Sequence, residues 1–334
     1  MRAYVLDRYG GPEGARLTDV PAPTPGPSDI LVAVRAAGLN PVDYKFREGK
    51  LRAIQRPKLP FVLGNEFAGE VIAVGNNVTR FRVGDRAFAR VAKSSGGAFA
   101  EQACVSEDLA AHIPAELDTV AAAAVPLAGL TALQALRDEL AVQSGQSVFI
   151  SGGSGGVGTF AIQIAKTLGA RVTTTASKHG EALVRSLGCD EVVDYASQDV
   201  STLGRRFDAG FDLIGGDTLG QMFDIMKPGS KVVSIAAVPE PHTASDLGGS
   251  PLLAAMFWII SYGIRSRARR AGVQYRYVFM HPSGSELAQL ADLNRQGTLR
   301  VILDKTFSFE NIAEAFAYLE RGHAKGKVVV TMHS

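Results

Sequence analysis

The chain has 334 residues, enough for two domains of ordinary size. Apolar residues make up 46% of the sequence and charged residues 20%, which is typical of a soluble globular protein with a substantial core. The 35 basic and 33 acidic residues leave a net charge of +2, and neither sign forms a long block, so the charge does not indicate a nucleic-acid partner.

Cysteine usage and the apolar runs predict a cytoplasmic protein. Cys104 and Cys189 are the 2 cysteines and stand far apart, which excludes a disulfide framework or a cysteine-based zinc cluster. The N-terminal residues lack the apolar core of a signal peptide. The longest apolar run, 252–264, is too short to span a bilayer unaided.

The first third of the chain is expected to be rich in strands. Short stretches with Val, Ile and Ala, at 30–38, 69–75 and 85–91, are separated by glycines and prolines. Closely spaced strands with glycine corners favour a closed or partly closed barrel.

From Thr119 the sequence becomes rich in Ala and Leu, as in helices, and strands and helices then alternate. Strands are predicted at 147–151, 171–176, 191–195, 211–215 and 231–236, and helices at 156–168, 180–187 and 217–226. Several strands are apolar throughout, which predicts a parallel sheet covered on both faces. The tail, 299–334, returns to strand, helix and strand and is expected to rejoin the first domain.

A glycine-rich turn, SVFISGGSGGVG (147–158), directly follows the first strand of this second region. Residues 153–158 fit G-x-G-x-x-G, the turn at which a dinucleotide pyrophosphate meets a helix N-terminus. Residues 152–156 also fit G-x-S-x-G, which presents a nucleophilic serine and would need a later acid and histidine. Candidates for these exist at Asp212, Asp217, His281 and His323. Glycines on both sides of Ser154 disfavour the serine nucleophile, so we favour the dinucleotide hypothesis.

The end of the second strand of this region predicts which dinucleotide binds. An Asp or Glu about 20 residues after the turn would accept a hydrogen bond from the ribose 2′-hydroxyl of NAD. The chain instead has Ser177 and Lys178 and no carboxylate before Glu181. A lysine and a hydroxyl attract a 2′-phosphate, so the sequence predicts NADPH. The alternative is that Lys178 is an ordinary solvated loop residue.

Characteristic stretches extend almost from end to end of the chain. They are AAGLNPVDYKFREG (36–49), LPFVLGNEFAGEVIAVG (59–75), VGDRAF (83–88), PLAGLTALQAL (126–136), the glycine turn, VDY (193–195), MKPGSKVVSI (226–235), YVFMHPSGSEL (277–287) and RGHAKGKVVV (321–330). In combination they resemble the medium-chain dehydrogenase/reductase superfamily, and within it the zinc-free quinone oxidoreductase and 2-alkenal (enone) reductase branch. The resemblance implies an α/β fold: a GroES-like β-barrel catalytic domain (1–124 and 299–334) with an inserted Rossmann NADPH-binding domain (125–298). We also expect a homodimer.

Zinc-binding members of the superfamily differ from this chain at their metal ligands. They carry Gly-His-Glu where this chain has Gly64-Asn65-Glu66, a cysteine near the position of Asn40, and a four-cysteine loop. Without the Cys and His ligands neither zinc site is expected. A reaction that depends on zinc to polarise an alcohol or ketone is therefore disfavoured.

The resemblance places NPVDYK (40–45) beside the nicotinamide. Hydride addition to an enone, alkenal or quinone leaves negative charge on a carbonyl oxygen, which needs hydrogen-bond donors. Asn40, Tyr44 and Lys45 offer such donors and are the candidate catalytic residues, with Lys45 also contacting the cofactor. Alternatively, Tyr44 is a packed aromatic residue and Asn40 caps a turn. The competing functions are a quinone reductase proper and a crystallin-like nucleotide-binding protein with little turnover.

The resemblance also implies the residues that hold NADPH. They are Gly153, Gly155, Gly156 and Val157 at the pyrophosphate, Ser177, Lys178 and Tyr195 around the 2′-phosphate and adenine, Thr131 and Ile235 near the nicotinamide, and His323, Ala324 and Lys325 closing over the cofactor from the other domain. His323 is either a hydrogen-bonding residue or a general base.

The segment 239–276 departs from a plain nucleotide fold, because an apolar run is followed there by RSRARR. One hypothesis is a helix that lines the substrate cleft or a subunit interface. The other is a helix that lies on a membrane surface through 252–270, since a basic flank favours anionic lipid.

Overall fold

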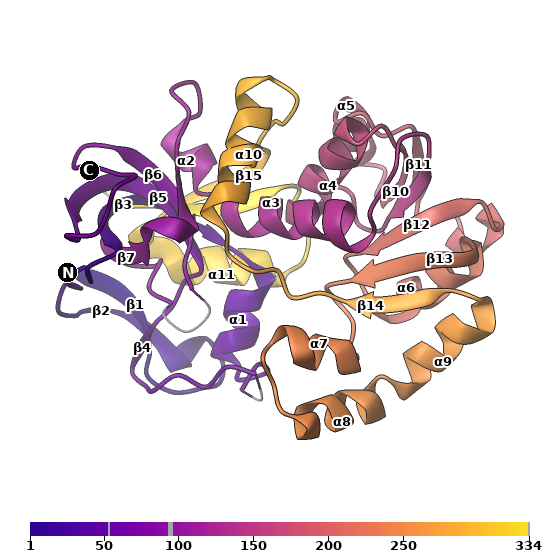
Figure 1. The fold of residues 1–334 in the computed structure, drawn as a ribbon, viewed down its shortest axis with the longest axis horizontal. Helices are drawn as coiled ribbons and strands as arrows, with labels where there is room; N and C mark the ends of the chain where they lie inside the picture. The colour runs from indigo at the N-terminus through magenta and orange to yellow at the C-terminus, as the bar shows by residue number, and fades with distance from the viewer. Residues whose placement is uncertain (53, 93–95, 333–334) are drawn as a thin grey trace. The chain divides into compact units, whose positions relative to one another are not determined.

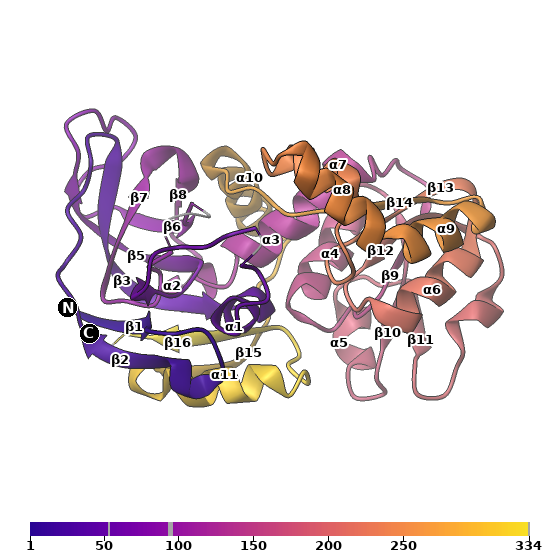
Figure 2. The same ribbon diagram turned by 90° about the horizontal axis from the view of Figure 1, so that it is seen from below.

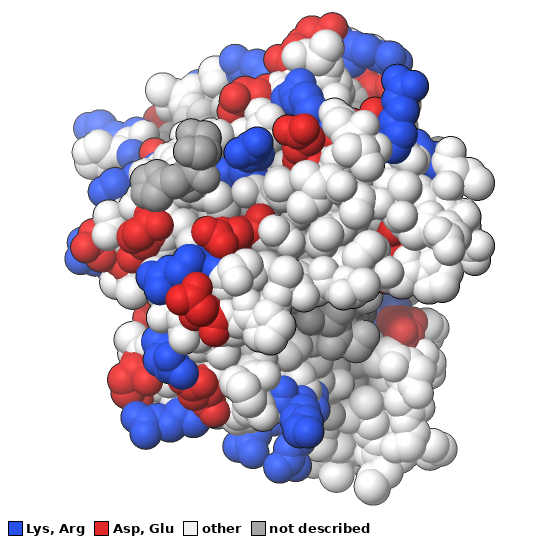
Figure 3. Space-filling view, turned by 90° about the vertical axis from the view of Figure 1, so that its left-hand side faces the viewer, with Lys and Arg blue, Asp and Glu red and all other residues white. Residues whose placement is uncertain are grey.

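The computed structural model describes residues 1–52, 54–92 and 96–332, and the chain divides into two compact units (Figure 1). The first unit consists of Met1–Leu130 and Pro282–Ser334, and the second of Thr131–His281. In the described residues no helix is long and apolar enough to cross a membrane. On the face drawn in Figure 3, Lys and Arg side chains are interspersed with Asp and Glu, in keeping with the near-neutral net charge.

The first unit is built from two sheets. A seven-stranded sheet has the order β15-β16-β3-β5-β6-β8, with β7 also paired to β3, and a three-stranded sheet has the order β2-β1-β4. The strands are β1 (Arg2–Leu6), β2 (Ala15–Asp19), β3 (Asp29–Leu39), β4 (Phe61–Val62), β5 (Glu66–Val74), β6 (Arg86–Arg90), β7 (Gln102–Ser106), β8 (Ala110–His112), β15 (Leu303–Ser308) and β16 (Lys327–Thr331). The strand-rich first third is thus confirmed.

The tail of the chain completes this unit. β16 pairs antiparallel with β3, Val328 opposite Leu39, and helix α11 (Ile312–Glu320) precedes it. Helix α1 (Pro41–Arg47) is held to α11 because Arg47 lies over the Phe316 ring and pairs with Glu320 at 2.9 Å. The C-terminal helix α11 therefore holds α1 in place.

The borders of the units differ from those predicted at 124/125 and 298/299. Helix α10 (Gly284–Arg295) packs on β8 so closely that a Cβ at Gly284 would lie 2.4 Å from the Ala110 carbonyl oxygen. This contact places residues 282–298 in the first unit. The sequence gives no sign of this border, because α10 follows the last strand of the second unit as one more helix after a strand. The other border falls within α3 (Pro126–Leu133), after α2 (Thr119–Ala122).

The second unit contains one six-stranded sheet in the order β11-β10-β9-β12-β13-β14, with every neighbouring pair parallel. This is the 3-2-1-4-5-6 order of doubly wound dinucleotide-binding sheets. The strands are β9 (Ser147–Ile150), β10 (Arg171–Ala176), β11 (Glu191–Asp194), β12 (Phe207–Asp212), β13 (Met226–Ser234) and β14 (Gln274–Tyr277). The predicted parallel sheet is confirmed, although β12 begins and ends earlier than predicted.

The helices of the second unit are α4 (Gly156–Thr167), α5 (Glu181–Ser186), α6 (Gly216–Ile225), α7 (Pro241–Asp246), α8 (Pro251–Ile260) and α9 (Tyr262–Ala271). Only Ser261 separates α8 from α9, and both views show the two helices running along the β14 side of the sheet (Figures 1 and 2).

Candidate active site and nucleotide site

Asn40 lies between β3 and α1, and its side chain contacts buried partners. Its Nδ2 donates to Glu66 Oε1 at 2.6 Å and to the Gly38 carbonyl at 3.5 Å, and its Oδ1 accepts from Lys327 Nζ. Both amide hydrogens are therefore used within the protein. Asn40 was predicted either to offer a donor beside the nicotinamide or to cap a turn, and here it is the N-cap residue of α1 with its side chain held by these partners.

A buried ion pair underlies Asn40. Lys327 Nζ lies 2.7 Å from Glu66 Oε1 and donates to the Leu39 carbonyl at 3.1 Å, and the two side chains are 3% and 0% exposed. The other carboxylate oxygen, Glu66 Oε2, accepts from the Leu127 amide at 2.6 Å. Because both charges are paired and hydrogen-bonded, the protein tolerates them in its interior.

Asn65 stands where zinc-binding members carry their histidine, and it links two further buried groups. Its Nδ2 donates to Asp43 Oδ1 at 2.5 Å, and its Oδ1 accepts from Arg90 at 2.9 Å. Asp43 Oδ2 also accepts from the Asn40 backbone amide at 2.7 Å. The two positions at which the zinc-binding members have a cysteine and a histidine are thus joined through Asp43.

Burial changes the protonation of this network. It raises the pKa of Asp43 to about 7, against the opposing hydrogen bonds from Asn65 and the Asn40 amide. It also lowers the pKa of Arg90 to about 10. Among the described residues, no group of three or more His, Cys, Asp or Glu side chains could hold a metal ion.

Tyr44 and Lys45, in contrast, keep their polar atoms available. Both side chains are half-buried on α1, and among the described residues neither is hydrogen-bonded to the protein. Burial raises the pKa of the Tyr44 phenol and lowers the pKa of the Lys45 ammonium group. The Tyr44 ring also packs on the core, so the packed-aromatic hypothesis describes its ring and leaves its hydroxyl free.

The predicted residues His323, Ala324 and Lys325 form the short connection from α11 to β16. His323 is exposed, and the other two are half-buried. The flanking residues Glu320 and Lys327 contact Arg47 and Asn40, at the two ends of α1. The first unit thus anchors this connection and α1 to the same buried framework.

In the second unit the glycine turn follows β9 and needs glycine for steric reasons. A Cβ at Gly153 would lie 2.2 Å from Thr174 Oγ1, and one at Gly158 would lie 2.4 Å from the Gly152 carbonyl oxygen. Gly152 adopts φ +68° and its amide donates to Thr175 Oγ1 at 2.8 Å. The turn therefore packs directly against β10 and the start of α4.

The N-terminus of α4 has no capping side chain and is called the bare start of α4 below. Its N-cap is Gly155, which has no side chain to satisfy the first amides, and Gly156 and Val157 are the first two helical residues. Such a terminus presents N–H groups and a positive dipole end to an anion. The turn and helix start fit a dinucleotide pyrophosphate.

The other predicted cofactor residues of this unit follow the strand ends. Ser177 and Lys178 come after β10 and Tyr195 after β11, and the pairing of Ala176 with Asp194 places these two strand ends side by side. Lys178 is exposed, and Tyr195 is 63% exposed. Ile235 follows β13, while Thr131 is buried in α3.

Asp212, a possible acid for a serine triad, has another role. It is 0% exposed, its Oδ1 accepts from Ser151 Oγ at 3.0 Å, and its Oδ2 accepts from Ser234 Oγ at 2.6 Å. It thereby ties together the ends of β9, β12 and β13. Sequence analysis missed this network, although serines at the ends of two apolar strands were a usable signal.

Comparison with known proteins covers nearly the whole chain. Residues 26–115 match the alcohol dehydrogenase GroES-like domain, and residues 187–330 match the zinc-binding dehydrogenase family. The NAD(P)H oxidoreductase RTN4IP1, mitochondrial, of Danio rerio is 36% identical over 99% of this chain and 91% of its own. The chloroplastic NADPH-dependent alkenal/one oxidoreductase of Arabidopsis thaliana is 33% identical over 99% of this chain and 79% of its own. The structure of the quinone oxidoreductase from Coxiella burnetii superposes with a TM-score of 0.86 at 32% identity, covering 100% of this chain and 99% of that one.

Proposed function

Because the chain belongs to the medium-chain dehydrogenase/reductase family, in its zinc-free branch of quinone and alkenal/one oxidoreductases, we propose that it uses NADPH to reduce an α,β-unsaturated carbonyl compound or a quinone. The chain is an oxidoreductase with a nicotinamide cofactor. The observation that carries the proposal is the bare start of α4, at the carboxyl edge of a sheet with dinucleotide-binding strand order.

The proposed cofactor residues divide between the units. In the second unit Gly153, Gly155, Gly156 and Val157 would meet the pyrophosphate, Ser177, Lys178 and Tyr195 the adenosine end, and Thr131 and Ile235 the nicotinamide. In the first unit Lys45, His323, Ala324 and Lys325 are the further proposed cofactor residues. When bound, the reduced nicotinamide supplies a hydride to the activated carbon.

The preference for NADPH rests on the end of β10. Lys178 is exposed and Ser177 half-buried, and both would favour a 2′-phosphate. The first carboxylate after them, Glu181, is paired with Arg185 at 2.8 Å, and NAD would need such a group free to accept from its ribose.

The proposed chemistry of the chain itself depends on α1. Reduction of the acceptor leaves negative charge on its carbonyl oxygen, and a positioned donor stabilises that charge. Tyr44 Oη and Lys45 Nζ are the free donors of the motif. The Tyr44 phenol has an ordinary pKa of 10.0 and burial raises it further, so the hydroxyl is protonated at neutral pH and can donate a hydrogen bond.

The test is steady-state oxidation of NADPH and of NADH against a panel of enones, alkenals and quinones. We expect turnover with at least one of these classes and a higher kcat/KM with NADPH. Tight NADPH binding without turnover of any acceptor would instead indicate a binding protein. The cytoplasmic location and the homodimer remain predictions. Cell fractionation tests the first, and light scattering tests the second.

A further inference from the structure

Helix α8 exposes apolar side chains at unusual density. The described residues include 11 large hydrophobic side chains that are exposed, and six of them lie within 252–262. These six form what we call the apolar patch: Leu252 (80% exposed), Met256 (38%), Trp258 (52%), Ile259 (67%), Ile260 (48%) and Tyr262 (57%). Scattered exposed hydrophobic residues are ordinary, but a cluster of this kind marks an interaction surface.

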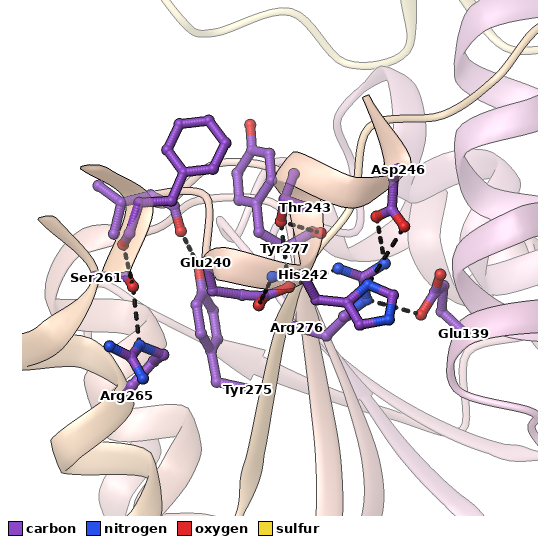
Figure 4. Close-up of polar contacts among 12 residues, drawn as sticks. Glu139, Glu240, His242, Thr243, Asp246, Ser261, Arg265, Tyr275, Arg276 and Tyr277 are labelled. Carbon is purple, nitrogen blue, oxygen red and sulfur yellow. Dashed lines mark hydrogen bonds and ion pairs between the residues drawn. The ribbon is translucent and has the colours of Figure 1, made fainter. Parts of the chain in front are cut away.

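The segment that carries the patch is fixed firmly to the sheet (Figure 4). Arg276 on β14 pairs with Glu139, with Glu240 just before α7, and with Asp246 at the end of α7. Thr243 Oγ1 also donates to the Tyr277 carbonyl at 3.1 Å. The helix that precedes α8 is therefore immobilised by buried and half-buried contacts.

The junction of α8 and α9 is fixed as well (Figure 4). Ser261 is buried and donates to the Phe257 carbonyl at 2.5 Å, and Arg265 Nε donates to Ser261 Oγ at 2.9 Å. Arg265 also lies over the Trp258 ring, 5.5 Å from its centroid. The fold thus presents the patch at a defined place.

α8 and α9 each have an outward side, on either side of the break at Ser261. Leu252, Met256, Ile259 and Tyr262 follow one another at steps of three or four residues, and the next steps reach Ser266 and then Arg269 and Arg270. The inward residues, Phe257, Ile264 and Ala268, are buried or half-buried at the same spacing. The outward side is therefore apolar along α8 and cationic at the end of α9.

The charge of this segment has one sign. Residues 247–273 contain Arg265, Arg267, Arg269 and Arg270 and no acidic residue. Arg267 pairs with Asp224 of α6 at 3.1 Å and Arg265 with the α8 backbone, whereas Arg269 and Arg270 are exposed and make no ion pair among the described residues. Two guanidinium groups thus remain for an anionic partner.

We propose that α8 and α9 dock on an anionic lipid surface. The apolar patch would enter the boundary between headgroups and acyl chains, Trp258 and Tyr262 would lie at headgroup level, and Arg269 and Arg270 would contact lipid phosphates. A second copy of the chain offers a poorer partner, because a two-fold contact centred on the apolar patch pairs the apolar halves but leaves Arg269 and Arg270 without an anionic partner. An anionic bilayer offers acyl chains to the apolar patch and phosphates to Arg269 and Arg270.

Trp258 is the single tryptophan of the chain, so tryptophan fluorescence reports directly on the apolar patch. With vesicles of phosphatidylcholine and phosphatidylglycerol we expect co-sedimentation of the full-length protein and a blue shift of Trp258 emission, both weakened by salt. Vesicles of phosphatidylcholine alone should give a much smaller effect. The double variant Arg269→Gln, Arg270→Gln keeps the fluorophore and should lower vesicle partitioning by about 25-fold, since each arginine near a charged surface contributes roughly fivefold.

The matched control is Arg82→Glu, Val83→Glu, which changes an exposed arginine and an exposed apolar residue in the loop between β5 and β6. This variant should bind vesicles as the wild type does, and all variants should retain their circular dichroism and NADPH oxidation. The proposal fails if the wild type does not bind anionic vesicles, or if the control loses as much binding as the arginine variant. It also fails if Ile259→Glu turns a dimer into a monomer in light scattering and Trp258 is already blue-shifted without lipid, because the patch is then a subunit interface.

Discussion

The two units hold their functional residues by different means. In the first unit α1 is positioned by buried charged and amide side chains that come from distant segments, with Asn40, Glu66 and Lys327 at the centre. In the second unit the nucleotide turn is positioned by backbone geometry and by glycines that pack against β10. Removing a side chain should therefore damage the first site most, and adding one should damage the second.

The buried pair of the first unit should give the largest effect. Lys327→Met leaves Glu66 charged in the interior, which costs about 3–5 kcal/mol of unfolding free energy. A surface pair offers a matched control, because Lys227 lies 2.7 Å from Asp208, the same distance as in the buried pair, with side chains 48% and 26% exposed. Lys227→Met should cost less than about 1 kcal/mol. Denaturant unfolding measures both.

A double variant protects this prediction against a simple failure to fold. Lys327→Met combined with Glu66→Gln removes both charges, so it should recover part of the lost stability. Equal losses for the buried and the surface lysine would contradict the comparison of the two units.

The next effect concerns pH. Folded Asp43 keeps its proton up to about pH 7, whereas its ordinary pKa is 3.8. The folded state therefore binds the proton more tightly, and this stabilisation is complete below about pH 4 and is lost as the pH rises through about 7. Asp43 should contribute a slope of up to about 1.4 kcal/mol per pH unit within that window.

Denaturant unfolding between pH 4 and 8 measures this slope as the difference between the wild type and Asp43→Asn. The variant is expected to be less stable overall, because its amide cannot accept both hydrogen bonds of the carboxyl group. Parallel curves for the two proteins would show that Asp43 titrates at its ordinary pKa.

At the nucleotide site, Lys178→Glu should weaken NADPH binding by about 10- to 150-fold, since a charge-assisted bond to phosphate contributes roughly 1.5–3 kcal/mol. NADH binding should change far less, and Lys178→Arg should keep the preference. Cofactor titration by fluorescence measures both constants. An equal loss of affinity for the two cofactors would show that Lys178 does not contact the 2′-phosphate.

The smallest effect is expected at the glycine turn. Gly156→Val places a side chain at the bare start of α4, and we expect the NADPH dissociation constant to rise by about tenfold or more while circular dichroism stays unchanged. Ser154→Ala in the same turn should bind NADPH and reduce acceptors as the wild type does. An esterase activity that Ser154→Ala abolishes would revive the serine hypothesis.

Local patterns predicted the second unit well. Apolar strands, helices between them and the glycine turn are all contiguous, so the parallel sheet and the bare helix start follow from neighbouring residues. The first unit was predictable as strand-rich, but its network was not. Lys327 bonds to Asn40 across 287 positions, and in the sequence it is one lysine among several near the end of the chain. Pairings of this kind depend on tertiary packing, which no local pattern encodes.

The position of Lys327 also has a consequence for biosynthesis. All strands of the second unit lie within residues 131–281, so this unit can fold on the ribosome as soon as that stretch has emerged. Asn40 and Glu66 emerge much earlier, yet they lack their buried cation until β16 leaves the exit tunnel. A nascent chain that has not yet released β16 would then carry a folded nucleotide unit and an α1 without its buried cation, so reductase activity would arise only after Lys327 has left the exit tunnel.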